Sequence, residues 1–398
     1  MQTTFLKLDS FLKSHQAFWR FEPFMASSIG IVPWQYKYPE LSQWLEELSD
    51  LQIEDLKSDS RQLTQCLNEF LPNLSCTLKL NQLDLLDMKG MQLDRSLRTG
   101  VPGRKLEQIM SMGEAALKCQ HGSEWLEWCS GKGYLGRVLA SHSNLPVTSF
   151  EYQKILCESG QKEADKLNLP MTFVQGDALS SSALSVLNKN QHAVALHACG
   201  DLHISLIEKA TLLGLPALTI SPCCYHLIQH NHYQPLSKQA RSSDLQLTKA
   251  ELRIPLQETV TGGARIKRQR FLEMSYRLGL DLILREVCGY QTYMPIPSIK
   301  KSMLSSGFES FCQWASETKK LSLPKHIVFD DFYSRGIQRY WQMERLSLVQ
   351  QPFRRSLEMW LVFDKALYLI ERGYQVSLSI FCSKKVTPRN ILIQAVKR

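Results

Sequence analysis

The chain has 398 residues, of which 44% are hydrophobic and 21% charged, a composition typical of a globular protein with more than one structural unit. No run of about 18 apolar residues occurs and the N-terminal sequence lacks a signal-peptide pattern, so we expect neither a transmembrane helix nor a secretory signal. Eleven scattered cysteines, an odd number, predict reduced thiols in a cytoplasmic protein. The net charge is +9, and a local basic excess could serve an anionic partner or form a solubilising surface; no membrane partner is expected.

Residues 1–104 are predicted to form a mainly helical N-terminal unit. Apolar residues recur there at helical spacing, as at Leu41, Leu45 and Leu48. An aromatic-rich stretch precedes them, with Phe18, Trp19, Phe21 and Phe24. These aromatic side chains could form a core or stack on bases. The loop signal Gly100-Val-Pro-Gly103 ends the unit.

Residues 105–226 are predicted to form a parallel sheet flanked by helices. A helical pattern is followed by five short apolar runs that each end in small or polar residues. The runs are Trp125 to Trp128, Val147 to Phe150, Met171 to Val174, Ala193 to Leu196 and Leu215 to Ile220. The spacing leaves room for one helix and two loops between successive runs, which is typical of repeated βα units.

A basic, mainly helical insertion is predicted over residues 227–356. Between residues 227 and 360 there are 20 Lys and Arg against 12 Asp and Glu, so almost all of the net charge falls there. The densest basic cluster follows Gly262-Gly263 and consists of Arg265, Lys267, Arg268 and Arg270. These side chains could bind phosphates of RNA or form a solvated helix face.

Residues 357–398 are predicted to complete the sheet. A helical run from Leu357 to Arg372 stops at Gly373, a C-cap residue. Alternating apolar residues then lead through a Thr387-Pro-Arg-Asn390 turn into a second strand, which predicts an antiparallel hairpin. We therefore predict an α/β fold: a Rossmann-like methyltransferase sheet with an N-terminal helical unit and a helical insertion before the C-terminal β-hairpin.

The loop after the first strand is predicted to bind a cofactor. Gly131 and Gly133 stand where a strand passes into a helix, and glycine there allows the backbone to approach a ligand closely. A P-loop is disfavoured because Lys132 is followed by glycine rather than Ser or Thr. A dinucleotide fingerprint fits formally, since Gly131, Gly133 and Gly136 make G-x-G-x-x-G.

Acidic residues at successive strand ends favour S-adenosylmethionine. Glu127 precedes the loop, where a carboxylate would repel pyrophosphate but could accept from the cationic methionine end of this cofactor. Glu151 could accept both ribose hydroxyls. Asp177, followed by Ala178, could accept from the adenine amino group. Cys129 completes the predicted cofactor-binding set.

Three motifs resemble one methyltransferase family, which includes the glutathione S-transferase C-terminal-domain-containing and methyltransferase-like 25 proteins. They are Trp128-Cys-Ser-Gly-Lys-Gly-Tyr-Leu-Gly136, Leu196-His-Ala-Cys-Gly-Asp-Leu202 and Ser221-Pro-Cys-Cys-Tyr-His226. The last two also resemble motifs of acceptor-stem tRNA 2′-O-methyltransferases. The resemblance covers residues 105–226 and more loosely the C-terminal region, and it implies S-adenosylmethionine as cofactor. The loop departs from the common G-x-G-x-G form because Cys129 replaces its first glycine.

Four residues after the fourth and fifth strands are predicted to act on the methyl acceptor. His197 and Asp201 follow the fourth strand, and Cys223 and His226 follow the fifth. Either histidine could act as a base toward a hydroxyl. The alternative for His197 is a structural hydrogen bond.

Other chemistry at these strand ends is less favoured. Cys199 and Cys223 stand where RNA 5-methylcytosine enzymes carry cysteines, one of them a covalent nucleophile. A zinc site from Cys223, Cys224, His226, His230 and His232 is conceivable, but adjacent cysteines are a poor chelate spacing and we predict no metal.

The sequence thus predicts a methyltransferase that acts on RNA, either tRNA or rRNA. A protein or small-molecule methyltransferase and a non-catalytic cofactor-binding scaffold are the alternatives. The sequence does not indicate an oligomeric state.

Overall fold

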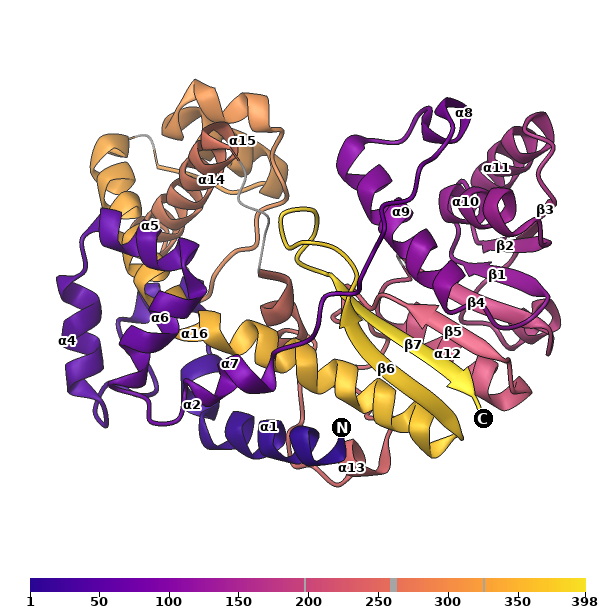
Figure 1. Ribbon diagram of the computed structural model, residues 1–398. Helices are drawn as coiled ribbons and strands as arrows, with labels where there is room; N and C mark the ends of the chain where they lie inside the picture. The colour runs from indigo at the N-terminus through magenta and orange to yellow at the C-terminus, as the bar shows by residue number, and fades with distance from the viewer. Residues whose placement is uncertain (197, 258–262, 325) are drawn as a thin grey trace. The chain divides into compact units, whose positions relative to one another are not determined.

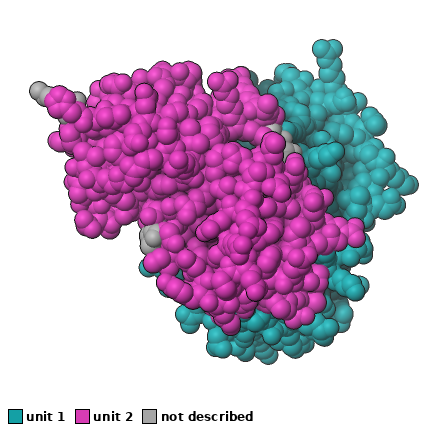
Figure 2. All heavy atoms as spheres, turned by 90° about the vertical axis from the view of Figure 1, so that its left-hand side faces the viewer, with its two compact units in different colours: residues 1–14, 78–260, 354–398 teal, residues 15–77, 261–353 magenta. Residues whose placement is uncertain are grey.

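The computed structural model describes residues 1–196, 198–257, 263–324 and 326–398 (Figure 1). The chain forms two compact units, coloured separately in Figure 2. Unit 1 contains residues 1–14, 78–260 and 354–398, and unit 2 contains residues 15–77 and 261–353. The predicted N-terminal unit and insertion are therefore each divided between the two units. Periodicity along the chain could not show this, because helices distant in sequence pack together.

Unit 1 is built on a mixed sheet, in which the described residues form seven strands in the order β3-β2-β1-β4-β5-β7-β6. The strands are β1 (Glu124–Trp128), β2 (Val147–Glu151), β3 (Met171–Gln175), β4 (Gln191–Ala195), β5 (Ala217–Ile220), β6 (Tyr374–Ile380) and β7 (Ile391–Lys397). The first five are parallel, and β7 pairs antiparallel with both β5 and β6. The predicted Rossmann-like α/β class is confirmed, including the reversed last strand.

The helices of the parallel part are α9 (Gly103–Lys118), α10 (Tyr134–Ser143), α11 (Lys154–Lys166) and α12 (Asp201–Leu213), with a 3-10 turn η1 (Ser181–Val186) before β4. The central strands are buried, as apolar runs covered on two faces should be. Trp125 and Trp128 of β1 are almost completely buried. Each buried side chain of this size contributes about 2–3 kcal/mol to folding.

The rest of unit 1 comes from both ends of the chain and from residues 227–257. Its elements are α1 (Gln2–Ser14), α8 (Arg95–Arg98), α13 (Lys238–Arg241), η2 (Glu251–Gln257) and the C-terminal part of α16 (Phe329–Glu371), with α7 (Cys76–Leu80) at the boundary. The predicted helix from Leu357 is thus the end of a much longer one. It ends before Gly373, whose φ of +85° fits the predicted C-cap.

Unit 2 is helical. It contains α2 (Gln16–Trp19), α3 (Pro23–Ile29), α4 (Pro39–Glu47), α5 (Asp50–Ser58), α6 (Ser60–Asn68), α14 (Ala264–Leu282), η3 (Ile283–Val287), η4 (Lys301–Ser306), α15 (Phe308–Lys319) and the N-terminal part of α16. Phe18 and Trp19 are buried, and the Phe18 ring packs 5.7 Å from that of Trp34. These aromatic residues therefore belong to a core, because buried rings cannot stack on bases.

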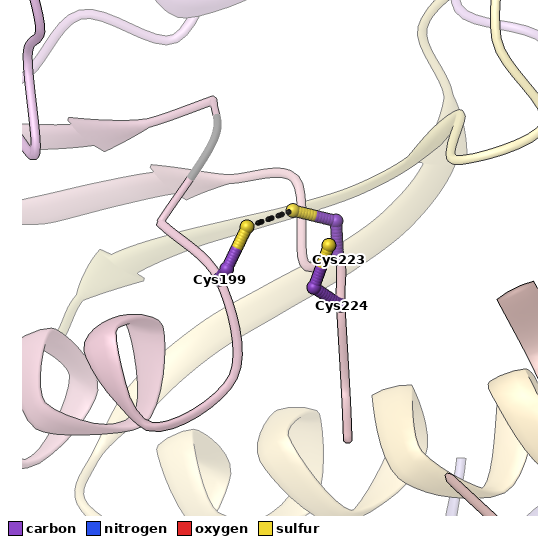
Figure 3. Close-up of side chains that lie close together, drawn as sticks. All are labelled: Cys199, Cys223 and Cys224. Atoms are coloured by element: carbon purple, nitrogen blue, oxygen red, sulfur yellow. Dashed lines mark hydrogen bonds between the residues drawn. The ribbon is translucent and has the colours of Figure 1, made fainter. Parts of the chain in front are cut away.

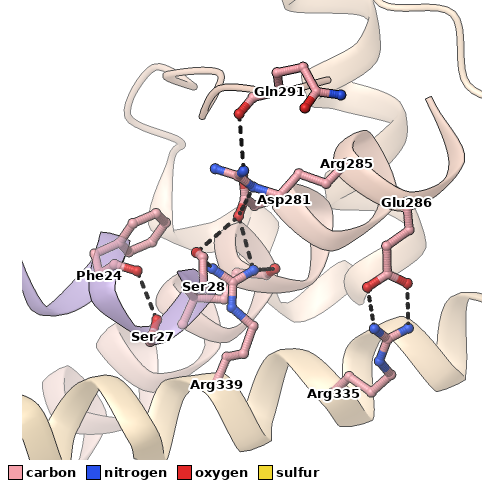
Figure 4. A network of polar contacts seen from close by, with 10 residues as sticks. Phe24, Ser27, Ser28, Asp281, Arg285, Glu286, Gln291, Arg335 and Arg339 are labelled. Carbon is pink, nitrogen blue, oxygen red and sulfur yellow. Dashed lines mark hydrogen bonds and ion pairs between the residues drawn. The ribbon is translucent and has the colours of Figure 1, made fainter. Parts of the chain in front are cut away.

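A buried carboxylate joins three helices of unit 2 (Figure 4). Asp281 of α14 accepts hydrogen bonds from Arg285 of the adjoining η3 at 3.1 Å and from Arg339 of α16 at 3.0 Å. Ser28 of α3 donates to the same carboxylate at 3.4 Å. Two guanidinium groups therefore face this one carboxylate, so Asp281 is not buried without a counter-charge. No helix in the described ranges is long and apolar enough to cross a membrane.

Candidate functional site

A cleft of about 380 Å³ lies at the carboxyl ends of β1, β2 and β3, where ligands bind in sheets of this kind. It is lined by Cys129, Phe150, Glu151, Tyr152, Gln153, Gly176, Asp177, Ala178 and Leu202. Four predicted cofactor residues, Cys129, Glu151, Asp177 and Ala178, are therefore brought together. Glu127, Gly131 and Gly133 are not among the described residues that line it.

The loop between β1 and α10 has an unusual backbone. Cys129, Gly131 and Gly133 all have positive φ angles, of 55°, 59° and 70°. Cys129 thus adopts a left-handed conformation, which costs more free energy for cysteine than for the glycine usual at this position. At Gly133 a Cβ atom would lie 2.4 Å from the ring of Phe173, so the loop passes too close to β3 for any side chain there.

Glu151 holds this loop at the end of β2. One carboxylate oxygen accepts from the Gly131 amide and the other from the Gln153 amide, both at 2.9 Å. The side chain is buried at the cleft wall. Since each carboxylate oxygen has two acceptor positions, both can still accept from a ligand hydroxyl.

The opposite wall of the cleft follows β3. A Cβ atom at Gly176 would lie 2.6 Å from the ring of Phe150, so only glycine lets the chain pass there. Asp177 accepts from the Leu179 amide at 2.9 Å. This bond turns the chain back, and Ala178 is then held through its carbonyl oxygen, which accepts from Ser205 of α12 at 2.7 Å.

A second group of predicted residues lies at the β4–β5 edge, defined here as residues 198–201 and 221–226. Cys199 and Cys223 pair as an isolated parallel bridge, and their Sγ atoms are 3.4 Å apart (Figure 3). Cys224 joins them, and hydrogen bonds from Cys199 and Cys223 lower the pKa of its thiol. The sequence points to Cys199 and Cys223 together at these strand ends, but it does not place Cys224 with Cys199.

The other predicted acceptor-side residues are placed differently. Asp201 begins α12 and accepts from the Gln229 amide at 2.7 Å. The Nδ1 atom of His226 is buried and has no hydrogen-bond partner among the described residues. Burial, followed by the charges of Arg253 and Lys249, lowers the pKa of His226. His197 lies outside the described residues.

Residues 104–231 match the model of a family described as "Methyltransferase domain". The chain carries a methyltransferase domain. This match includes the β1 loop, the cleft and both cysteine-bearing strand ends, so the domain accounts for most of unit 1 but for less than half of the chain.

Three solved structures are similar to part of the chain. A Pyrococcus abyssi tRNA (uracil-54, C5)-methyltransferase in complex with S-adenosyl-L-homocysteine is 17% identical, with a TM-score of 0.25 and 28% of each chain covered. An Aquifex aeolicus SAM-dependent methyltransferase is 17% identical, with a TM-score of 0.26, 32% of this chain and 72% of that one covered. A Thiobacillus denitrificans SAM-dependent methyltransferase in complex with S-adenosyl-L-homocysteine is 18% identical, with a TM-score of 0.24. This last match covers 33% of this chain and 56% of the Thiobacillus denitrificans chain, so little more than half of that chain is spanned.

The cleft has groups that suit S-adenosylmethionine, the cofactor that the sequence predicts. Glu151 offers buried acceptors suited to two neighbouring hydroxyls, and Asp177 offers an acceptor on the opposite wall. The apolar faces of Phe150 and Leu202 line the space between them, where a flat ring could lie. These contacts stay predictions for the individual residues.

Glu127 of the methyltransferase domain lies behind the loop and is buried. Ser149 donates to its carboxylate at 2.9 Å, and the amides of Gly136 and Leu135 stabilise the ionised form. Burial nevertheless dominates and raises the pKa of Glu127 to about 7. The charge of Arg137 also favours the ionised form, and the predicted contact with the methionine end of the cofactor would add a second positive charge.

We expect Glu127→Gln to stabilise the cofactor-free protein in alkaline solution. The pKa of Glu127 is raised on folding from 4.5 to about 7, so folding favours the protonated form. Stability is therefore lost as the pH rises from about 4.5 through 7, by a total of about 3 kcal/mol. Glutamine stays neutral and avoids the loss. Urea unfolding at pH 5 and pH 8 would contradict this if wild type and variant lost equal stability between the two.

A buried polar network behind the β4–β5 edge was not predicted. Tyr225 donates to Glu358 of α16 at 3.4 Å, and Tyr233 donates to Asp364 of the same helix at 2.8 Å. Lys365 is completely buried, donates to Tyr233 at 3.1 Å and has a pKa that burial lowers to about 8. The sequence gives no sign that these charged residues of α16 are buried, because their partners are 131–133 residues away.

Proposed function

We propose that the chain methylates RNA. The observation that carries this proposal is the distribution of charge between the two units. Unit 2 has 18 Lys and Arg against 17 Asp and Glu, whereas unit 1 has 29 against 21. Almost all of the net positive charge therefore belongs to the unit that contains the cleft, where a polyanionic substrate would have to bind.

Basic side chains surround the β4–β5 edge. Lys249 and Arg253 act electrostatically on His226, and Arg389 acts on Cys224. Arg389 belongs to the connection between β6 and β7, which also carries the exposed Lys384 and Lys385. Ser221 donates to the Arg389 carbonyl at 3.3 Å and so ties this connection to the end of β5. Such an arrangement suits phosphate groups on either side of an acceptor nucleotide.

The basic cluster predicted on the insertion supports the proposal less. Arg270 forms an ion pair with Glu344 at 2.8 Å, and Lys267 pairs with Glu54 at 3.3 Å. Half of the cluster therefore neutralises acids of its own unit. Arg265 and Arg268 are exposed on the first turns of α14 and remain the candidates for phosphate contacts in unit 2.

His226 is the proposed base. When bound, S-adenosylmethionine supplies the methyl group. The lowered pKa of His226 leaves the imidazole neutral at physiological pH, so one ring nitrogen can take the proton of an acceptor hydroxyl. The Asp201 carboxylate accepts from the Gln229 amide and so orients the segment between His226 and Gln229. This chemistry favours a ribose hydroxyl as acceptor.

The proposal is tested by labelling. Lysate from cells that lack the chain is incubated with the purified protein and radiolabelled S-adenosylmethionine, then treated with ribonuclease or protease. We expect label that ribonuclease removes. Label removed only by protease would identify a protein substrate and overturn the proposal. Absence of label despite cofactor binding would favour a small-molecule acceptor or the scaffold alternative.

We expect the double variant Lys249→Glu, Arg253→Glu to bind RNA about 10- to 100-fold more weakly at low salt. Each lost phosphate contact should also reduce the slope of log affinity against log salt by roughly 0.7–0.9. Affinity for S-adenosylmethionine should not change. Filter binding over a salt series measures both effects. Lys162→Glu, on the exposed face of α11, is the control for net charge. If it lost as much RNA affinity as the double variant, the location of Lys249 and Arg253 would not matter.

A further inference from the structure

The three cysteines of the β4–β5 edge meet at one point (Figure 3). The Sγ atoms of Cys199, Cys223 and Cys224 all lie within 4.8 Å of one another, and those of Cys199 and Cys223 are 3.4 Å apart. A metal ion with metal–sulfur bonds of about 2.3 Å in tetrahedral geometry separates its sulfur ligands by roughly 3.8 Å. The observed spacing brackets this value, so an ion could be held with small side-chain rotations.

The backbone holds this arrangement independently of any ligand. Cys199 and Cys223 form a parallel bridge, and the Gly200 amide donates to the Cys223 carbonyl at 3.1 Å. A Cβ atom at Gly200 would lie 2.0 Å from the Leu227 carbonyl oxygen, so the two segments are in contact there. The cysteine side chains are therefore presented by two segments that cannot separate without loss of backbone hydrogen bonds.

Cys224 overcomes the usual difficulty with adjacent cysteines as ligands. Consecutive side chains in an extended segment point to opposite sides. Cys224 instead has a φ of 46°, in the left-handed region that non-glycine residues rarely adopt. This turn brings its Sγ atom to the same side as that of Cys223 (Figure 3). Strain of this kind, at a position where it makes three thiols converge, is typical of functional sites.

We propose that Cys199, Cys223 and Cys224 bind a thiophilic divalent metal of the Zn²⁺ class through three thiolates. Three protein ligands leave the fourth position of a tetrahedron open. The site lies next to the cofactor cleft, because the amide of Leu202, which lines the cleft, donates to the Cys199 carbonyl at 3.2 Å. This proposal does not depend on RNA as the substrate.

The test measures metal binding by the full chain. The protein is stripped with a chelator under reducing conditions and titrated with Zn²⁺, and Co²⁺ serves as a spectroscopic probe. We expect one equivalent of Zn²⁺ and, with Co²⁺, intense thiolate-to-metal charge-transfer bands with the visible bands of tetrahedral coordination. Each of Cys199→Ser, Cys223→Ser and Cys224→Ser should weaken binding at least about 10- to 100-fold and reduce the charge-transfer intensity.

Cys66→Ser and Cys76→Ser are the matched controls, because these free cysteines belong to unit 2. They should leave the Co²⁺ spectrum unchanged. Thermal unfolding of the metal-free variants shows that they fold: their midpoints should match that of the metal-free wild type. Stoichiometric Zn²⁺ that survives the Cys199→Ser, Cys223→Ser double substitution would overturn the proposal. So would failure of the reduced wild type to bind Zn²⁺.

Discussion

Glu151→Ala will weaken the binding of S-adenosylmethionine by about two orders of magnitude. The substitution removes the predicted acceptors for two ribose hydroxyls, and hydrogen bonds to a charged group contribute about 1.5–3 kcal/mol each. It also removes the bonds to the Gly131 and Gln153 amides, so the backbone bond from the Ser130 amide to the Phe150 carbonyl is left to hold the loop on β2. Isothermal titration calorimetry with the purified chain measures the affinity.

Two comparisons separate these contributions. Glu151→Gln keeps one acceptor and should lose less affinity than the alanine variant. Glu158→Ala, at an exposed site on the following helix, removes the same charge without touching the cleft and should bind normally. Unchanged affinity in Glu151→Ala would contradict the assignment of the ribose contact, whatever the substrate of the enzyme is.

Asp364→Ala will destabilise unit 1 by about 3–5 kcal/mol. Asp364 is completely buried and accepts from Tyr233 and from the amides of Leu236 and Ser237 at 2.7–3.2 Å. Alanine would leave these donors without an acceptor. It would also leave the charge of Lys365 buried without the carboxylate that offsets its desolvation. Urea unfolding of Asp364→Ala and of the wild type measures the loss of stability.

A substitution on the same helix provides the control. Glu371 accepts from the Lys238 amide at 2.8 Å but is exposed, so Glu371→Ala should cost no more than about 1 kcal/mol. Replacing Lys365 by methionine in the Asp364→Ala background should recover part of the stability, because the unpaired charge is then gone. If Asp364→Ala destabilised the protein no more than Glu371→Ala, the network would have no role in holding α16 against residues 233–237.

The parallel strands could be predicted from the sequence because each is a short apolar run that ends in a polar residue. Those ends carry Glu151 and Asp177, and in a parallel sheet successive ends must meet at one edge. The cleft could therefore be predicted without any long-range contact. The hairpin was equally plain, since β6 alternates and a proline turn follows it.

Features that depend on contacts between distant segments could not be predicted. Cys199 joins Cys223 and Cys224 only because β4 and β5 are neighbours and the chain turns left-handed at Cys224. Glu127 is hidden behind its loop because Gly136 lets the carboxylate approach, at a site where a Cβ would lie 2.5 Å from it. The acids that pair with the basic residues of α14, Glu54 and Glu344, come from segments far away in sequence, so this packing could not be predicted either.

The position of β7 between β5 and β6 determines the order in which the sheet can be completed. Of the seven strands in the described part of the chain, β7 is the last to be synthesised, yet it pairs with β5. During translation, β5 therefore keeps an open hydrogen-bonding edge from Ile220 until the ribosome has made Ile391 and the residues after it. An apolar edge strand left open in this way can pair with other nascent chains. Folding yield should thus depend on how well that edge is shielded while the helices of the intervening segment are made.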